Sequence, residues 1–556
     1  MDGLVAAFGG VLLGMGAGMG FSSVLPLTGS GAPHPLVIAV SVIAAAAFAA
    51  VIYVCQPVTR FKLRDIPGPW APPLFGHLPQ ILKIGSMKFY MTLKEQYGPV
   101  FTVWYGRRPF IVVTEPTVAR YVGTKLLNHP NFINTSIMRG QEKEIDAAGL
   151  VAARDNYWRT VRTTWQPAFS PAALSGPAPT ASSPGMHRSA CYGGKAPGAD
   201  CSLSISPRPA PSASAPGQRL VNACKTFFRS ASIHTGSKWS RISMLLPELS
   251  PIWARLSHAY PDKPLLDQWD ARKAILETSK ALIEGWRQHA EGGANGADAG
   301  TAPAKPVMGG GSFLAQLLKG SSSSKLTDVQ LAAQANTFTL AGYETTANAL
   351  AFTMFFLGLH PDAEAKLVAE VDALADRLTS EGKPGLRAAT MEDLVHLPYT
   401  EACFQEAMRL FPPAHLTTRE VGAEPFNLPV NLGEGKGMKT YSIPPNTVIV
   451  LSINTIHHDP ALWPEPEAYK PERFLEKQEG LNINHVPFGY GSRMCIGYRF
   501  ALAEAKLALA RLYHDFNFRL LPGQAPMQVS VGITQAPKYG VNMAVTPRQR
   551  PLAASS

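Results

Sequence analysis

The stretch Phe488-Gly-Tyr-Gly-Ser-Arg-Met-Cys-Ile-Gly497 contains an aromatic residue, two glycines and an arginine at fixed offsets from Cys495. An isolated cysteine most often behaves as a small, buried apolar residue. Here several chemically distinct residues surround one thiol, and this pattern indicates a site built around that thiol.

Each position of this stretch suits a thiolate that ligates a haem iron. Such a ligand pushes electron density onto the iron and favours cleavage of the O–O bond. Gly491 would let the loop turn sharply, and Gly497 would let the next helix approach the porphyrin. Arg493 is placed to pair with a haem propionate, while backbone N–H groups after Cys495 can hydrogen-bond the sulfur. The positive end of a helix beginning near Ile496 would stabilise the thiolate.

The stretch resembles the haem-binding signature Phe-x-x-Gly-x-Arg-x-Cys-x-Gly of the cytochrome P450 family. The resemblance covers roughly residues 64–170 and 245–547 and implies a mainly α-helical fold with small β-sheets around a buried haem b. Parts of the sequence also look similar to plant carlactone oxidases and to animal drug-metabolising and thromboxane-synthase types. All five signature positions are present, which implies haem contacts with Cys495 as the iron ligand: Phe488, Gly491, Arg493, Cys495 and Gly497.

A second motif, Ala341-Gly-Tyr-Glu-Thr-Thr346, lies inside a helix predicted from an N-cap at residue 327 to about residue 360. A glycine and two threonines disfavour a helix centre, and such conflicts tend to mark functional sites. The motif resembles the Ala-Gly-x-Glu/Asp-Thr signature of the family's distal helix. The resemblance implies that Gly342 allows close approach to the haem and a local widening of the helix. It also implies that Thr345 hydrogen-bonds bound dioxygen and that Glu344 supplies protons.

Three more residues are expected at the haem propionates. Trp158 and Arg162 are four residues apart, so they lie on one face of a predicted helix. Taken alone, such a pair is more often ordinary packing and a surface charge. The family resemblance places both of them, together with Arg419, against the propionates. Residues 414–417, residues 533–534 and the loop before Trp158 are expected to line the substrate pocket.

A group of charged residues is expected to support the cysteine loop. Glu406 and Arg409 are three apart on one helix face, which by itself stabilises a helix only slightly. With Arg473 they resemble the family's buried charge triad, whose role is structural. The neighbouring His457 and His458 lack partners at metal-ligand spacing, so we interpret them as turn residues before Asp459-Pro460.

The composition narrows the class of partner. The net charge of +11 is spread along all 556 residues, which argues against nucleic acid and suits an anionic membrane or an acidic redox partner. The six cysteines form no CxxC pair, so we expect a reduced protein without disulfides or structural zinc.

The N-terminal region predicts a membrane anchor. Residues 3–59 contain no Asp, Glu, Lys or Arg, and residues 35–55 form an apolar run long enough to span a bilayer. Arg60, Lys62 and Arg64 follow, which puts the main body in the cytosol by the positive-inside rule. We expect a single-pass endoplasmic reticulum protein; a plastid transit peptide would usually be richer in Ser and Arg. The predicted parts are an apolar tail (1–34), a transmembrane helix (35–56), a proline-rich hinge (57–79), a catalytic domain (80–547) and a C-terminal tail (548–556).

One block departs from the family pattern. Between residues 171 and 218, 34 of 48 residues are Pro, Gly, Ser or Ala, although two helices are expected there. The block is a disordered insertion, a divergent replacement or intron sequence translated by mistake, within a low-complexity segment of about 171–235. We favour the intron because the composition changes abruptly at both ends, and family-like patterning resumes at residue 245, with a helix over 269–289. Transcripts that contain codons 171–230 would reject it.

The sequence therefore predicts a membrane-anchored haem-thiolate monooxygenase. It would insert one oxygen atom into an apolar small molecule, such as a terpenoid or a carotenoid fragment. Electrons would come from NADPH through a flavoprotein reductase docked on a basic face. Two alternatives stay open: an isomerase or dehydratase that rearranges a peroxide without a reductase, and a degenerate, non-catalytic haem-binding membrane protein.

Overall fold

The computed structural model describes residues 35–130, 137–139, 142–170, 201–205, 216–232, 235–292, 326–433, 435, 437–476 and 480–549. The chain divides into two compact units, Met1–Lys62 and Leu63–Ser556. The first contains helices α2 (Pro35–Cys55) and α3 (Pro57–Lys62), so α3 lies inside the predicted hinge. Among the described residues, no helix meets the length and hydropathy needed to cross a membrane. The predicted membrane span therefore stays a prediction.

The second unit is mainly helical with small sheets, as predicted. Its larger sheet has the order β1-β2-β7-β4, in which β2 pairs in parallel with β7. Strands β1 and β2 form a hairpin, as the apolar runs 100–104 and 110–114 on either side of Gly106-Arg-Arg-Pro109 predict. Two small sheets pair β5 with β6 and β9 with β10, and a third has the order β3-β11-β8. The strands are β1 (Val100–Tyr105), β2 (Arg108–Val113), β3 (Cys201–Ile205), β4 (Thr417–Glu420), β5 (Phe426–Asn431), β6 (Met438–Ile443), β7 (Val448–Leu451), β8 (Phe516–Leu520), β9 (Val529–Val531), β10 (Gln535–Pro537) and β11 (Val541–Pro547).

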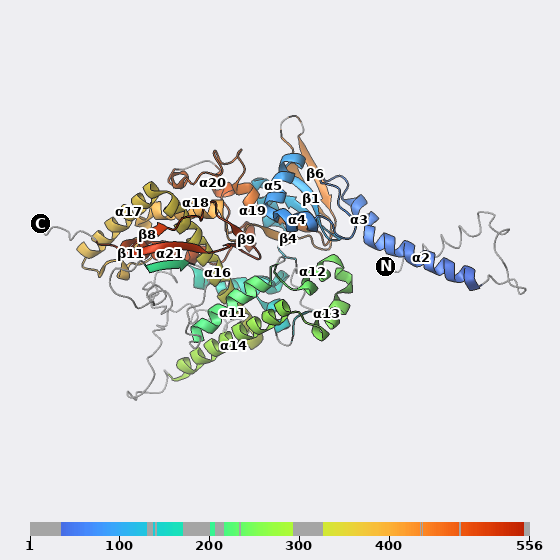
Figure 1. Ribbon diagram of the computed structural model, residues 1–556, viewed down its shortest axis with the longest axis horizontal. Helices are drawn as coiled ribbons and strands as arrows, with labels where there is room; N and C mark the ends of the chain where they lie inside the picture. The colour runs from blue at the N-terminus through green and yellow to red at the C-terminus, as the bar shows by residue number, and fades with distance from the viewer. Residues whose placement is uncertain are drawn as a thin grey trace, which may run out of the picture. The chain divides into compact units, whose positions relative to one another are not determined.

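The helical part of this unit is drawn in Figure 1, where α17, α18 and α21 lie together. Its helices are α4 (Leu78–Ile84), α5 (Ser86–Tyr97), α6 (Pro116–Lys125), α7 (Glu142–Ala148), α8 (Asp155–Trp165), α11 (Pro216–Ser230), α12 (Lys238–Leu245), α13 (Ser250–Ala259), α14 (Lys263–Gly292), α16 (Asp328–Leu359), α17 (Pro361–Ser380), α18 (Pro398–Leu410), α19 (Ile453–His457), α20 (Leu481–Asn484) and α21 (Tyr498–Asp515). Short 3₁₀ turns are η3 (Gln166–Phe169), η4 (Pro247–Leu249), η5 (Gly385–Ala388), η6 (Asp393–His396), η7 (Pro471–Phe474) and η8 (Gly491–Arg493).

The long helix α16 organises the core. The predicted start is confirmed, because Thr327 forms a capping box: Gln330 N donates to Thr327 Oγ1 at 3.3 Å and Thr327 N donates to Gln330 Oε1 at 3.0 Å. The helix ends before His360, and α17 begins at the next residue. The second half of α16 shares the largest hydrophobic cluster with α17, α18 and α21.

Helix α11 corrects one prediction. Family-like patterning was expected to resume only at residue 245, yet a helix begins at Pro216. Its buried Cys224 and Phe227 cluster with Ala271 and Ile275 of α14. The apolar face of α11 was missed because its first residues continue the Pro/Ala/Ser-rich composition. The sequence also predicts a short helix over 312–318 and a solvated loop over 320–324, and both lie outside the described residues.

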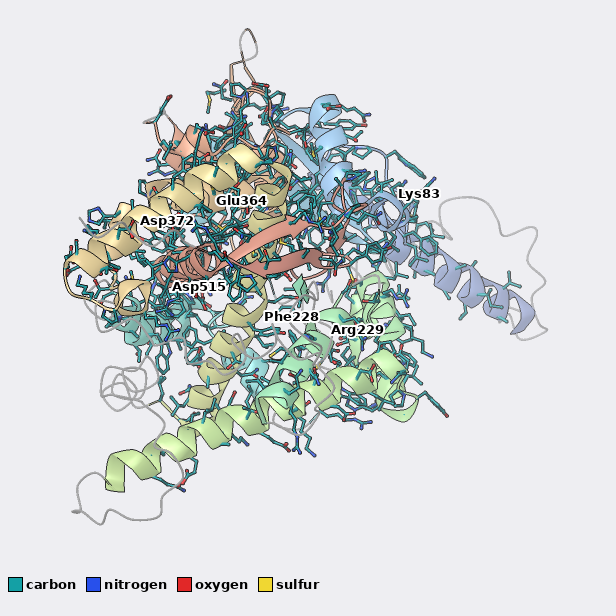
Figure 2. All side chains as sticks on the ribbon, turned by 60° about the vertical axis from the view of Figure 1, so that its left-hand side comes forward. Lys83, Phe228, Arg229, Glu364, Asp372 and Asp515 are labelled. Carbon is teal, nitrogen blue, oxygen red and sulfur yellow. The ribbon has the colours of Figure 1, made fainter. Side chains whose placement is uncertain are left out.

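The C-terminal strand is tied to the helices by one arginine. Arg548 Nη1 and Nη2 bind the two carboxylate oxygens of Asp372 at 2.7 and 2.5 Å, and Arg548 N donates to Asp515 O at 2.9 Å. Figure 2 labels Asp372 on α17 and Asp515 at the end of α21. The bidentate pair fixes the end of β11 to α17, and the backbone bond fixes it to α21, the helix that follows the cysteine loop.

Candidate active site

The cysteine loop is closed by backbone hydrogen bonds. Cys495 N donates to Phe488 O at 2.9 Å, and Met494 N donates to Gly491 O at 3.0 Å. The Cys495 side chain is exposed, and yet burial raises the pKa of its thiol. The backbone N–H of Gly497 hydrogen-bonds the sulfur, and together with the Arg162 guanidinium it partly offsets that rise. The sulfur is thus accessible to a metal, and the Gly497 N–H and the Arg162 guanidinium are the groups that favour its thiolate form.

Close packing explains the first glycine of the loop. Gly491 has φ +69°, and a Cβ at this position would lie 2.1 Å from Gly123 O of α6. A Cβ on Gly123 would in turn lie 2.7 Å from Tyr490 Cβ. Gly497 is less constrained, since its added Cβ would meet the Phe169 ring at 3.3 Å. The loop is therefore locked to α6 backbone against backbone.

Replacing Gly491 with alanine is expected to cost about 3–5 kcal/mol of folding free energy and to lower haem content. The cost combines left-handed backbone strain with a collision. Gly382→Ala is the matched control, because Gly382 has φ +75° but nothing within 4 Å of an added Cβ. It should cost only about 1–2 kcal/mol. Chemical denaturation of both variants measures the difference, and equal costs would contradict this packing argument.

The three predicted propionate arginines converge on the cysteine loop and the segments beside it. Arg162 Nη1 donates to Met494 O at 2.8 Å, and Arg419 Nη2 donates to Tyr490 O at 2.9 Å. The Arg493 guanidinium lies 4.4 Å from the ring centroid of buried Trp158. Arg493 also donates to three carbonyls at 2.7, 3.1 and 2.5 Å, those of Leu127, Leu150 and Ala153.

This arginine cluster has the charge and the spare donor that a haem needs. Burial lowers the pKa of Arg493 to about 9, with further lowering by Arg419, Arg162 and Arg154. Burial also lowers the pKa of Arg419 to about 10. Among the described residues, the buried Arg419 Nε has no hydrogen-bond partner. Crowded guanidinium groups with a spare buried donor fit the two carboxylates of a haem b.

His129 also belongs to this cluster, although no motif predicted it. Its ring hydrogen-bonds the Thr418 backbone, and burial together with Arg419 and Arg493 lowers the pKa of His129 to about 3. The ring is therefore neutral beside the arginines, and its single N–H is used in the hydrogen bond to the Thr418 backbone. A lone histidine after a helix end carries no sequence signal for such a role.

The motif at residues 341–346 of α16 is open at Gly342. Ala341 and Gly342 are exposed in the middle of α16, and a Cβ added at Gly342 would meet nothing within 4 Å. Thr345 Oγ1 donates to Ala341 O at 2.6 Å. The expected widening of the helix is absent, because α16 is continuous α-helix from Asp328 to Leu359. The Thr345 hydroxyl instead adds a hydrogen bond to an unbroken turn.

A half-buried acid, Glu344, precedes this threonine in the sequence. Glu344 Oε2 accepts a hydrogen bond from Thr534 Oγ1 at 2.5 Å, and burial raises the pKa of the carboxyl. Thr346, which follows Thr345 in the sequence, hydrogen-bonds Glu504 of α21. Because α21 begins three residues after Cys495, this bond holds the glutamate-threonine motif close to the helix of the cysteine loop.

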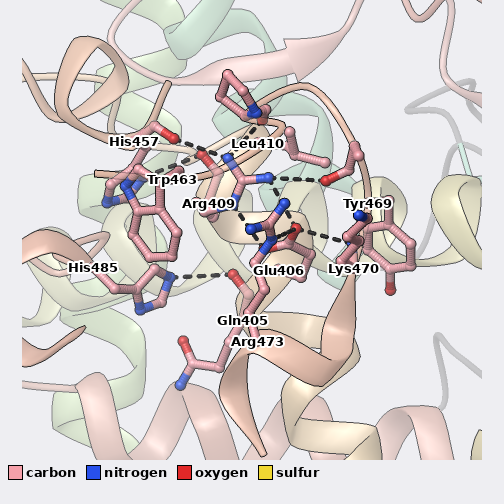
Figure 3. A network of polar contacts seen from close by, with 12 residues as sticks. Gln405, Glu406, Arg409, Leu410, His457, Trp463, Tyr469, Lys470, Arg473 and His485 are labelled. Carbon is pink, nitrogen blue, oxygen red and sulfur yellow. Dashed lines mark hydrogen bonds and ion pairs between the residues drawn. The ribbon is translucent and has the colours of Figure 1, made fainter. Parts of the chain in front are cut away.

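The structure brings the predicted charge triad together in the interior (Figure 3). Arg409 Nε and Nη2 donate to the two Glu406 oxygens at 2.7 and 2.8 Å, and both side chains are 0% exposed. Arg473 Nε reaches Glu406 Oε1 at 3.3 Å, and Lys470 N donates to the same oxygen at 3.0 Å. Every Glu406 oxygen is therefore engaged, which a buried carboxylate requires.

His457 connects the triad to the cysteine loop and is more than a turn residue. Arg409 Nη1 donates to His457 O at 2.9 Å. Val486 N donates to His457 Nε2 at 3.0 Å, so the ring proton lies on Nδ1, which donates to Arg409 O at 3.2 Å. Since Val486 lies two residues before Phe488, the triad and the cysteine loop share one hydrogen-bond network. His458 instead binds Glu467 and Leu410 O.

Among the residues predicted to line the substrate pocket, some are exposed and others are buried. Ala414 is exposed and Ile533 is 51% exposed, so both reach open space. His415 is buried, with Nε2 3.5 Å from Ser86 Oγ of α5, and burial lowers its pKa to about 4. Thr534 is 9% exposed and points to Glu344.

An accessible thiol at the start of a helix, an arginine cluster and an acid-threonine pair on a long helix together define a haem-thiolate protein. The sequence model of the cytochrome P450 family matches residues 66–176 and 298–542, and the chain belongs to this family. Membership implies a haem cofactor and a small-molecule substrate. The match leaves out residues 177–297, which include most of the Pro/Gly/Ser/Ala-rich block.

Curated relatives span most of the chain. Thromboxane-A synthase of Macaca fascicularis is 27% identical over 89% of this chain and 94% of its own length. Cytochrome P450 3A29 of Sus scrofa is 28% identical, covering 88% and 92%. Cytochrome P450 3A5 of Homo sapiens is 26% identical, covering 83% and 86%. The predicted similarity to thromboxane-synthase and drug-metabolising types is confirmed, while that to plant carlactone oxidases stays a prediction.

Proposed function

We propose that the chain is a monooxygenase that inserts one oxygen atom into an apolar small molecule. The observation that carries the proposal is that Glu344 and Thr345 are consecutive residues of α16, in the turn where Gly342 leaves open space. A half-buried carboxyl with a raised pKa keeps its proton to a higher pH than a solvated one, and Glu344 would supply protons through water to the place beside Thr345. Haem ligated by the Cys495 thiolate would supply the oxygen-activating chemistry.

The remaining residues would hold and orient the cofactor. Arg162, Arg419, Arg493 and Trp158 surround the place where propionates would be met, and Phe488 closes the loop on which Cys495 lies. Glu406, Arg409 and Arg473 would keep that loop in place.

The partners are part of the same proposal. Electrons would come from NADPH through a flavoprotein reductase, and the substrate would be a terpenoid, a carotenoid fragment or a molecule of similar polarity. Residues 35–56 would anchor the chain in the endoplasmic reticulum membrane, with the catalytic domain in the cytosol. The apolar sequence of α2 and the basic residues after it support this orientation.

One alternative has an observation in its favour. The similarity to thromboxane-A synthases favours an isomerase or dehydratase that rearranges a peroxide and needs no reductase. We favour the monooxygenase because a peroxide rearrangement draws no protons from outside the substrate, and so gives Glu344 no task. A degenerate protein would not need to keep the charge triad and the arginine cluster in full.

Thr345→Ala should uncouple the enzyme. With a reductase and NADPH, we expect product formation to fall at least about tenfold while NADPH is still consumed and hydrogen peroxide is released. Thr337→Ala is the matched control. Thr337 precedes Thr345 on α16, and its hydroxyl makes the equivalent bond to the carbonyl four residues before it, Ala333 O, at 2.8 Å. Product and peroxide yields with a panel of terpenoids, carotenoid fragments, sterols and fatty acids measure the outcome. Unchanged coupling in Thr345→Ala would favour the isomerase.

A further inference from the structure

The hairpin of β9 and β10 is fastened to the long helix beside the acid-threonine pair. Asn348 Nδ2 of α16 donates to Gln535 O at 2.9 Å, and Gln535 N donates to Pro413 O at 2.8 Å. At the turn, Gly532 N donates to Thr534 O at 3.0 Å. These bonds all engage the backbone of the hairpin, so they fix the position of Thr534 independently of its side chain.

From this fixed position the Thr534 hydroxyl contacts the carboxyl of Glu344. Thr534 Oγ1 donates to Glu344 Oε2 at 2.5 Å, and the threonine is only 9% exposed. The Thr345 hydroxyl is committed to Ala341 O, so the two threonines serve different acceptors. A short hydrogen bond to one carboxyl oxygen fixes the rotamer of a flexible glutamate.

In the part of the chain that the structure describes, two other titratable groups interact with Glu344, and both are neutral near pH 7. Cys224 of α11 lies close enough to interact electrostatically with Glu344, and burial raises the pKa of its thiol to about 11. Tyr343 on α16 has a pKa raised to about 12, mainly by burial. Burial raises the pKa of Glu344, and the Thr534 hydroxyl acts in the opposite direction. The ionised form of Glu344 is therefore stabilised chiefly by one hydroxyl from the hairpin.

We infer that Thr534 is a positioning residue for proton delivery, which holds the Glu344 carboxyl in one orientation and sets how readily it ionises. The inference rests on the proposed monooxygenase function for its catalytic meaning. Without the hydroxyl, the carboxyl keeps its proton to a higher pH and samples more rotamers. Both effects slow the release of protons toward Thr345.

An infrared pH titration of the haem-loaded full chain tests this inference without turnover. The C=O band of protonated Glu344 is identified as the band lost in Glu344→Gln. In Thr534→Val we expect its titration midpoint to rise by about one pH unit, the size of one hydrogen bond to a charged group. Thr534→Ser, which keeps the hydroxyl, should titrate like the unaltered protein. Ser530→Ala is the control, because the Ser530 hydroxyl donates to Ala536 O within the same hairpin.

Turnover adds the functional measurement. With reductase and NADPH, Thr534→Val should release at least about twice as much peroxide per NADPH, with the excess declining as the pH is raised, while Thr534→Ser restores coupling. Equal midpoints in Thr534→Val and the unaltered protein, or equal shifts in the valine and serine variants, would overturn the inference. A shifted midpoint in an enzyme that uses no reductase would overturn the proposed function and leave Thr534 as a positioning residue for Glu344.

Discussion

Arg409→Ala protein is expected to accumulate without haem. Arg409 makes five hydrogen bonds in the interior, two to Glu406 and three to the carbonyls of His457, Pro466 and Ala468. Its removal leaves the Glu406 carboxylate buried without its main partner, which typically costs about 3–5 kcal/mol. It also removes the guanidinium contact to His457, the residue that binds Val486 before the cysteine loop, and leaves only the bond from His457 to the Arg409 backbone.

The measurement is haem content per folded chain, with circular dichroism to count the folded chains. Arg287→Ala is the control, because Arg287 pairs with Asp328 at 2.5 Å while both side chains are exposed, 41% and 79%. Loss of an exposed pair of this kind costs about 0–1 kcal/mol, so haem content should stay unchanged. Normally loaded Arg409→Ala protein would show that the triad does not support the loop.

Cys495→Ala should abolish both the thiolate signature and the reaction. Carbon monoxide bound to the reduced protein should absorb where thiolate-ligated haem does, and the variant should lose that band because it lacks the proposed ligand. Cys224 and Cys403 are buried, and burial raises their thiol pKa values to about 11 and 12.

Cys403→Ala provides the comparison for this experiment. It removes a buried thiol of the core cluster and should lower stability modestly while the carbon monoxide band persists. Product formation with reductase and NADPH should fall to background only in Cys495→Ala. Retention of the thiolate band in that variant would show that another residue ligates the iron.

Local rules predicted the parts of the fold that depend on neighbours in sequence. The N-cap at Thr327, the hairpin of β1 and β2 and the sharp turn at Gly491 follow from capping, alternation and glycine preference. Helix α11 was missed because a Pro/Ala/Ser-rich start gives no helix signal, whereas its buried face is defined only by α14.

Contacts between distant residues were beyond such rules. Glu344 and Thr534 are 190 residues apart, and nothing in either neighbourhood indicates the other. The same holds for His129 beside Arg419 and Arg493, and for His457 between Arg409 and Val486. Family resemblance predicted the pairing of Glu406 with Arg473, which helix spacing alone could not. The predicted widening at Gly342 failed because Thr345 completes the turn instead.

The arginine cluster makes the cofactor a counter-ion as well as a reagent. Arg419 and Arg493 are held close together in a desolvated place, where their mutual repulsion opposes folding. Two carboxylates at that place would neutralise the repulsion, so capture of the cofactor and completion of the fold are thermodynamically linked. The cellular supply of haem would then set how much folded protein exists, and a chain synthesised faster than haem would be exposed to proteolysis.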